Sequence, residues 1–194
     1  MRARLALAVS DTRCILREVA LSNKPAQLIA ASPKATVPVL VLQDGQVVDE
    51  SLDIMRWSLE RRDPQGWLLA DPAATAMLIE ANDGAFKHHL DRYKYADRYG
   101  VDAAEHRSAG LAMLGALDRT LAGKANLCGD AMSLADAALL PFVRQFARVD
   151  GAWFDAQPLP RVKQWLERHL SSPLFERVSQ RVRPWSEGDP PVIF

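Results

Sequence analysis

The chain has 194 residues, 48% of them hydrophobic, and its 24 basic and 24 acidic side chains give a formal net charge of zero. This length can bury a sizeable core, and the charge balance argues against nucleic acid or an anionic membrane as the main partner, because both require a basic surplus. Cys14 and Cys128 make no disulfide framework, and neither a membrane-spanning run nor a signal peptide is evident. We expect a soluble, cytoplasmic protein.

The first 62 residues alternate helix-like and strand-like segments, which is an α/β pattern. Asp44-Gly45 lies between two apolar segments and is a strong hairpin signal. The apolar run before it is typical of a buried strand. In chain order, the predicted elements are a helix over 1–9, a strand over 14–21, a helix over 26–31, hairpin strands at 37–42 and 47–48, and a helix over 51–62.

From residue 71 onward the sequence shows no strand signal and indicates helices only. The segment 133–149 is apolar on nearly every face, so we expect it to be the central helix of this part. Ser133 and Asp136 have the spacing of a capping box that would start this helix, and Pro141 should bend it. The other predicted helices cover 73–98 (as one helix or two), the leucine stripe 111–121 ending near Gly123, 160–170 and 174–182.

The composition predicts two domains joined by a linker. Residues 63–72 contain two prolines and a glycine, which interrupt both helical and strand patterns. We therefore expect an α/β domain over 1–62, a linker over 63–72 and a helical domain over 73–194.

Pro38 stands at the front of the apolar strand, although proline has no N–H to donate to a neighbouring strand. One interpretation is a trans proline at the first position of an edge strand. Another comes from three segments taken together. They are Val37-Pro38-Val39-Leu40, then Asp49-Glu50-Ser51, then Ser133-Leu134-Ala135-Asp136 after Gly129. In this order and spacing they resemble the cytosolic glutathione transferases, up to about Trp185. The resemblance implies a thioredoxin-like amino-terminal domain followed by a helical domain of the glutathione transferase type.

The resemblance also implies a glutathione site at Lys34, Val37, Pro38, Glu50 and Ser51. The matching proline of the family is cis, and the N–H and C=O of Val37 would pair with the cysteinyl backbone of glutathione like an added strand. Ser51, at a helix amino terminus, would hold the γ-glutamyl carboxylate, and Glu50 would meet the ammonium. Alternatively, Ser51 only caps the helix. Lys34 either reaches the glycyl carboxylate or is a solvated loop lysine.

Other residue types suited to binding or catalysis carry less weight. Tyr93 and Tyr95 lie in the region expected to overhang the glutathione site, so they line a second-substrate pocket or form a solvated aromatic face. His88 and His89 are adjacent on one helix and lack the i, i+4 spacing of a zinc pair, so we predict no metal site. Cys128 is interpreted as structural.

In the family, a first strand and its loop precede the first helix and carry the Tyr, Ser or Cys that activates the glutathione thiol. Residues 1–7 already match the interior of that helix, and none of Ser10, Thr12 and Cys14 is placed to replace the missing residue. The sequence therefore leaves the catalytic residue unknown and predicts unpaired strand edges in the sheet. We expect the chain as written to conjugate glutathione poorly and to be a late-start version of a longer protein. A shortened chain that relies on a partner strand and a non-catalytic relative are the alternatives.

These observations predict a glutathione transferase-like enzyme. Glutathione, acting as co-substrate without a metal, would attack a small electrophile or exchange thiols with it. The expected assembly is a homodimer. The alternative is a non-catalytic protein that keeps the fold for binding or as a scaffold.

Overall fold

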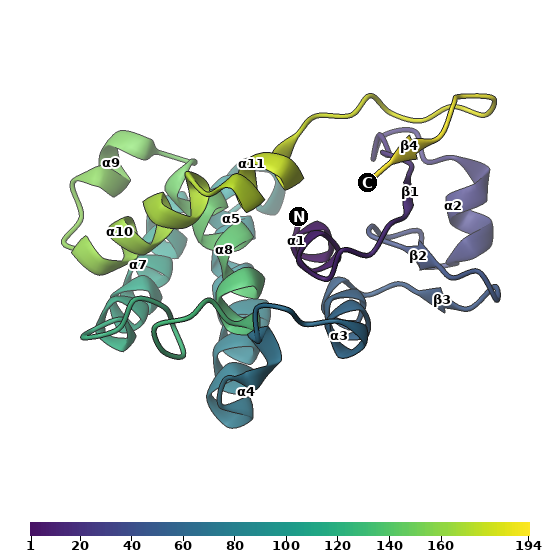
Figure 1. Cartoon of the computed structure of the whole chain (residues 1–194). Helices are drawn as coiled ribbons and strands as arrows, with labels where there is room; N and C mark the ends of the chain where they lie inside the picture. The colour runs from purple at the N-terminus through teal and green to yellow at the C-terminus, as the bar shows by residue number, and fades with distance from the viewer. The chain divides into compact units, whose positions relative to one another are not determined.

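The computed structural model describes all 194 residues and divides the chain into two compact units. Unit 1 consists of Met1–Gln65 together with Pro173–Phe194, and unit 2 of Gly66–Ser172. Unit 1 contains the thioredoxin-like part with its small sheets, and unit 2 is helical (Figure 1). The predicted domains were 1–62 and 73–194 with a linker over 63–72. The two units instead meet within that linker, and residues 173–194 group with the amino-terminal residues.

Unit 1 is organised around its first helix. Both α1 and α3 bury apolar side chains, and α1 packs against α3 and α11. Ala3, Leu7 and Ile54 form a buried cluster, and Leu40 and Val48 of the hairpin pack against it. The elements of unit 1 are α1 (Arg2–Val9), β1 (Ile15–Leu16), α2 (Ala26–Ala31), β2 (Leu40–Val41), β3 (Val47–Val48), α3 (Ser51–Arg61), α11 (Pro173–Ser179) and β4 (Val192–Ile193).

The hairpin predicted around Asp44-Gly45 is confirmed. β2 and β3 pair antiparallel with Leu40 opposite Val48, and Gly45 adopts a φ of 87°, in the left-handed region that glycine enters without a steric cost. The prediction that its first strand is buried is wrong, since β2 has only two residues and Val41 is 56% exposed. One face of this short ribbon covers the α1–α3 cluster and the other faces solvent, which is usual for antiparallel pairs.

The prediction that only helices follow residue 71 is also wrong, because the chain returns to unit 1 and ends in a strand. β4 pairs antiparallel with β1, placing Ile15 opposite Ile193 (Figure 1). Beyond the strand, the Phe194 N–H donates to the Cys14 carbonyl at 3.0 Å. One edge of β1, expected to be unpaired, is therefore occupied. A two-residue strand is too short to produce a periodic signal in a sequence.

Unit 2 consists of helices that overlap the predicted ones. The helix predicted over 111–121 begins earlier, at Ala103, and ends at Thr120. The predicted helix over 73–98 is divided by a π-helical turn at 82–86, and the short α9 was not predicted. The elements are a 3₁₀ turn (Trp67–Leu69), α4 (Pro72–Ala81), the π turn (Asn82–Phe86), α5 (Lys87–Lys94), α6 (Ala96–Tyr99), α7 (Ala103–Thr120), α8 (Leu134–Ala147), α9 (Gly151–Asp155) and α10 (Pro160–Leu170).

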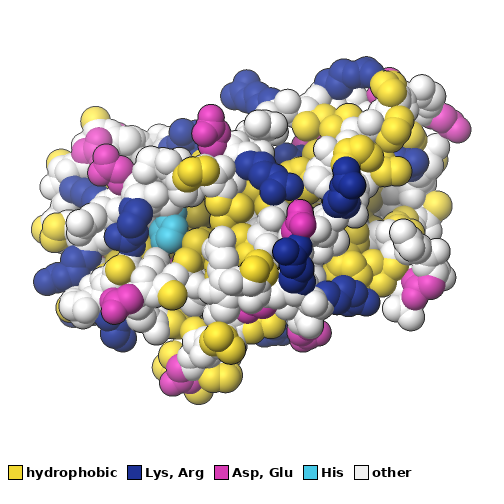
Figure 2. Space-filling model, viewed as in Figure 1, with side chains coloured by type: hydrophobic (Ala, Val, Ile, Leu, Met, Phe, Trp, Pro, Cys, Tyr) yellow, Lys and Arg dark blue, Asp and Glu magenta, His cyan; other side chains and the backbone are white.

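The surface carries charges of both signs. In the face drawn in Figure 2, Lys and Arg side chains lie among Asp, Glu and apolar side chains, in keeping with the equal numbers of basic and acidic residues. None of the helices combines the length and the apolar character needed to cross a membrane.

The central helix of unit 2 is α8, as the sequence predicts. Most of its side chains are buried, and α4, α5 and α10 pack against it. The capping box is formed, with the Ser133 N–H donating to Asp136 Oδ2 at 2.9 Å and the Asp136 N–H to the Ser133 hydroxyl at 3.4 Å. A helix start of this kind satisfies two backbone donors that have no partner within the helix.

Asp136 does more than cap α8. Its side chain is fully buried, and its Oδ1 accepts the Leu127 N–H at 2.9 Å and the Trp165 indole N–H at 2.8 Å. One carboxylate thus connects the loop before α8, the start of α8 and the middle of α10. A buried charge is tolerated where its acceptor sites are filled by donors in this way.

We expect Asp136→Ala to lower the free energy of unfolding by roughly 3–5 kcal/mol, because it leaves several buried donors without acceptors. Asp136→Asn should cost less, since its amide oxygen can still accept from Leu127 and Trp165. Urea unfolding followed by far-UV circular dichroism measures both changes. Asp130→Ala, at an exposed position of the preceding loop, serves as the control and should change stability by no more than about 0.5 kcal/mol. A loss below 1 kcal/mol for Asp136→Ala would contradict the central role of this carboxylate.

Candidate glutathione site

The predicted site residues come from two segments of unit 1 that meet in space. Lys34 lies in the loop that follows α2, and Glu50 and Ser51 lie where α3 begins. The Lys34 ammonium is 3.1 Å from Glu50 Oε1 and 3.1 Å from Asp49 Oδ1, and it joins the two segments by ion pairs. The structure therefore brings together residues that are more than a dozen positions apart in the sequence.

The start of α3 presents free backbone donors. Glu50 is the N-cap residue in an extended conformation, and no side chain caps the helix. The first amide with a helical partner is Ile54 N–H, which donates to the Glu50 carbonyl at 3.0 Å. The N–H groups of Ser51 and the two residues after it have no backbone acceptor. With the partial positive charge of the helix end, they can hold a carboxylate.

Val37 and Pro38 lie on the same loop as Lys34, three and four residues further along. The Val37–Pro38 peptide bond is cis, as the resemblance implies. Val37 is 44% exposed, and neither its N–H nor its C=O takes part in a backbone hydrogen bond of the chain. These two groups are consequently available to an extended peptide ligand.

Asp49, which the sequence places beside the site, organises the charges there. The buried Ser32 hydroxyl donates to Asp49 Oδ2 at 2.8 Å, and this bond, together with Lys34, lowers the pKa of the Asp49 carboxyl. The bonds to Glu50 and Asp49 raise the pKa of Lys34. Lys34 is thus already paired, and a ligand carboxylate must compete with Asp49 and Glu50 for its ammonium. Sequence reasoning did not select Ser32 or Asp49, because neither contact is visible without the folded loop.

The two tyrosines predicted to line a second-substrate pocket lie in different environments. Tyr93 is 7% exposed, and its ring is 5.1 Å from that of Phe146. Burial raises its pKa, although Arg107 opposes the shift. Tyr95 is 45% exposed, and the Lys94 ammonium lies 4.8 Å from its ring centre. Tyr93 is therefore part of the core of unit 2, whereas Tyr95 is open to solvent. Their role in binding a second substrate stays a prediction.

Neither cysteine has the surroundings of an activated thiol. Cys14 is half-buried beside β1, and burial raises its pKa, although Arg4 opposes the shift. The thiol of Cys14 is thus mainly protonated at neutral pH. Cys128 is half-buried in unit 2 with its sulfur 3.7 Å from the Thr75 hydroxyl, a contact that fits a structural role.

Unit 2 contains an apolar cavity of about 170 Å³ between α4, α7 and α8. Its lining includes Asn82, whose buried Oδ1 has no hydrogen-bond partner and which begins the π-helical turn. No sequence signal singled out this residue, since an asparagine within a helical segment is usually solvent-facing.

Comparisons with known proteins agree with this architecture. A model of the glutathione S-transferase N-terminal domain matches residues 1–61, and a model of the C-terminal domain matches residues 101–168. A search of curated proteins found no match.

Solved structures of the same kind share the fold at low sequence identity. Apo glutathione S-transferase III is 23% identical, with 94% of this chain and 93% of that chain covered and a TM-score of 0.74. A glutathione S-transferase domain-containing protein of Marinobacter aquaeolei is 22% identical, with 90% and 93% covered and a TM-score of 0.72. A glutathione S-transferase of Rhodospirillum rubrum is 22% identical, with 94% and 88% covered and a TM-score of 0.70.

A thioredoxin-like part with an exposed proline-fronted strand, followed by a bundle around a capped buried helix, defines the glutathione transferase class of fold. With both domain models matched in order, the chain belongs to the glutathione S-transferase family.

The hydrogen bonds and charges around Asp49 lead to a testable prediction for the pKa of its carboxyl group. We expect the Asp49 carboxyl to titrate below the ordinary aspartate value, and Ser32→Ala to move its pKa upward, because the variant removes the largest stabiliser of the charged form. Carbon-detected NMR titration of the side-chain carboxyl measures both. Thr36→Ala, an exposed change in the same loop, should leave the Asp49 pKa where it was. If the pKa of Asp49 were unchanged in Ser32→Ala, the proposed effect of the Ser32 hydroxyl on Asp49 would be wrong.

Proposed function

We propose that unit 1 binds glutathione and presents its thiol to a small electrophilic substrate. The observation that carries this proposal is the uncapped start of α3, with the free amide of Ser51, on the same side of unit 1 as the loop of Lys34 and Val37. Membership of the glutathione S-transferase family supports the choice of ligand.

Each part of the tripeptide has a suitable partner in this arrangement. The γ-glutamyl carboxylate is held by the Ser51 N–H and hydroxyl, and its ammonium by Glu50, which is exposed and already faces a cation. The Val37 N–H and C=O pair with the cysteinyl backbone, as a strand edge pairs with an added strand. Lys34 receives the glycyl carboxylate if it exchanges its bonds to Asp49 and Glu50.

In the proposed reaction, the glutathione thiolate attacks an electrophilic carbon, a C–S bond forms, and the leaving group departs with the bonding electrons. With a disulfide substrate, the thiolate forms a new S–S bond and releases the other thiolate. In both cases the protein must favour the thiolate over the thiol. The rival proposal is a protein that binds glutathione without turnover. It is supported by the raised pKa of Cys14, which makes this thiol a poor nucleophile at neutral pH.

Glutathione titrations of the wild type and of Ser51→Ala, followed by calorimetry, test the binding site. We expect the wild type to bind and the variant to lose roughly 1.5–3 kcal/mol, about 10- to 150-fold in affinity, because it lacks a hydrogen bond to a charged group. Ser108→Ala is the matched control, since Ser108 is exposed in unit 2 and donates to the Ala104 carbonyl of its own helix. No binding by the wild type, or equal binding by wild type and Ser51→Ala, would refute the proposed site.

Turnover distinguishes the enzyme from the binding protein. The rate at which the wild type conjugates a standard aromatic electrophile, compared with the uncatalysed rate, is the relevant measurement. We expect Cys14→Ala to have the same conjugation rate and the same glutathione affinity as the wild type. The reason is that a thiol with a raised pKa is a poor nucleophile at neutral pH. A drop in rate at constant affinity in this variant would instead identify Cys14 as a catalytic residue.

We further propose that the protein assembles as a homodimer and acts in the cytoplasm, as expected from the resemblance. Light scattering of the purified protein tests the first point, with an expected mass of twice the 21.5 kDa chain.

A further inference from the structure

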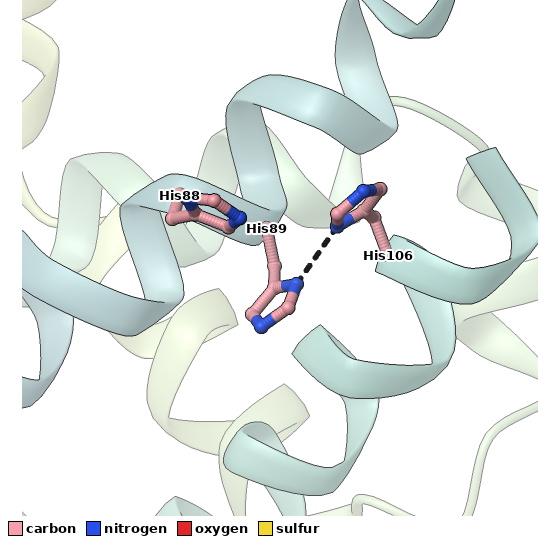
Figure 3. A group of neighbouring side chains, drawn as sticks. All are labelled: His88, His89 and His106. Atoms are coloured by element: carbon pink, nitrogen blue, oxygen red, sulfur yellow. Dashed lines mark hydrogen bonds between the residues drawn. The ribbon is translucent and has the colours of Figure 1, made fainter. Parts of the chain in front are cut away.

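Three of the four histidines of the chain meet in unit 2. His88 and His89 lie on α5, and His106 comes from the facing helix α7 (Figure 3). Sequence reasoning rejected a metal site because it considered only the adjacent pair on one helix. The third histidine becomes a neighbour only because α5 and α7 pack together in the folded chain.

The imidazoles are close enough to share one ion. His89 Nδ1 and His106 Nδ1 are 2.9 Å apart, and one ligating nitrogen of each of the three rings can be chosen so that all lie within 4.8 Å of one another. Two nitrogens on a tetrahedral zinc ion, each about 2.0–2.1 Å from the metal, are separated by roughly 3.3 Å. The separations therefore have to change by no more than about 1.5 Å for the three nitrogens to share one ion.

We propose that His88, His89 and His106 form a binding site for one divalent transition-metal ion, with Zn²⁺ as the first candidate. Imidazole nitrogen is a preferred ligand of Zn²⁺, Ni²⁺ and Cu²⁺, whereas Mg²⁺ and Ca²⁺ require oxygen ligands that this cluster does not offer. Neither the family membership nor the proposed glutathione site predicts this ion, and the proposal stands independently of both.

The cluster is graded from buried to exposed, which suits an open coordination site. His106 is 8% exposed, His89 is half-buried and His88 is exposed. An ion can thus enter from the side of His88, and a water molecule can take the fourth position, as in other three-histidine zinc sites. Bound in this way, the ion cross-links α5 and α7 within unit 2.

The charged groups near the cluster act on a bound cation in opposite directions. Glu105, on α7, would offset part of the charge of the ion, whereas Arg92, on α5, would oppose its binding. Without a metal, the short Nδ1–Nδ1 contact is a hydrogen bond from one imidazole to the other. Metal binding at both atoms requires the donor to move its proton to Nε2, which changes the tautomer and not the net charge.

Calorimetric titration with ZnCl₂ tests the proposal on the full chain, freed of any histidine tag, stripped with chelator and kept without glutathione. Addition of CoCl₂ and recording of the visible spectrum report the coordination geometry independently. We expect one equivalent of Zn²⁺ per chain, tetrahedral Co²⁺ bands and a rise in Tm of about 5–10 °C at a hundredfold excess over Kd.

Substitutions decide whether the three histidines are the ligands. We expect His88→Ala, an exposed change with little risk to folding, to weaken Zn²⁺ binding at least tenfold and to abolish the tetrahedral Co²⁺ bands, and His88→Ala/His89→Ala to abolish stoichiometric binding. His169→Gln is the control, because this fourth histidine does not belong to the cluster. Its Nε2 forms a hydrogen bond of 2.8 Å with Asn126 Oδ1. Its folded form should bind Zn²⁺ like the wild type. No uptake by the wild type, retained binding by the double variant, or loss of binding in folded His169→Gln would each overturn the proposal.

Discussion

The arrangement of unit 2 depends on one buried carboxylate. Asp136 fixes the start of α8 through Ser133, and its second oxygen holds the loop at Leu127 and the indole of Trp165 on α10. Because α8 is the helix against which α4, α5 and α10 pack, its starting point and rotation determine where those helices lie. The contact of α5 with α7 carries the three-histidine cluster. The hydrogen bonds at the start of α8 thus influence the position of the histidine cluster, although they do not contact it.

Unit 1 uses a different principle, since it has little sheet and depends on helix packing. α1 is buried along almost its whole length and packs on α3, which sets the direction in which the start of α3 points. The hairpin covers the same apolar cluster and holds the preceding loop nearby. Ser51 begins a helix of this cluster, and Val37 lies in the loop just before the hairpin that covers it, so both sets of free backbone groups lie beside packed elements.

Local signals predicted the elements whose causes are local. The helices at 26–31 and 160–170 have the predicted boundaries, because Pro25 and Pro160 fix where they begin. The capping box at Ser133 and the turn at Gly45 are equally local. The returning strand at Val192–Ile193, the bond from Ser32 to Asp49 and the approach of His106 to His89 were not predicted. Each joins residues that are distant in the sequence, and a single sequence gives no measure of such distances.

The return of residues 173–194 to unit 1 has a consequence for the order in which the protein forms. Unit 1 is discontinuous, and the whole of unit 2 lies between its two parts in the sequence. During synthesis from the amino terminus, all of Gly66–Ser172 is made before the partner of β1 exists. β1 therefore stays without this partner throughout the synthesis of unit 2, and unit 1 is completed only when residues 173–194 return to it.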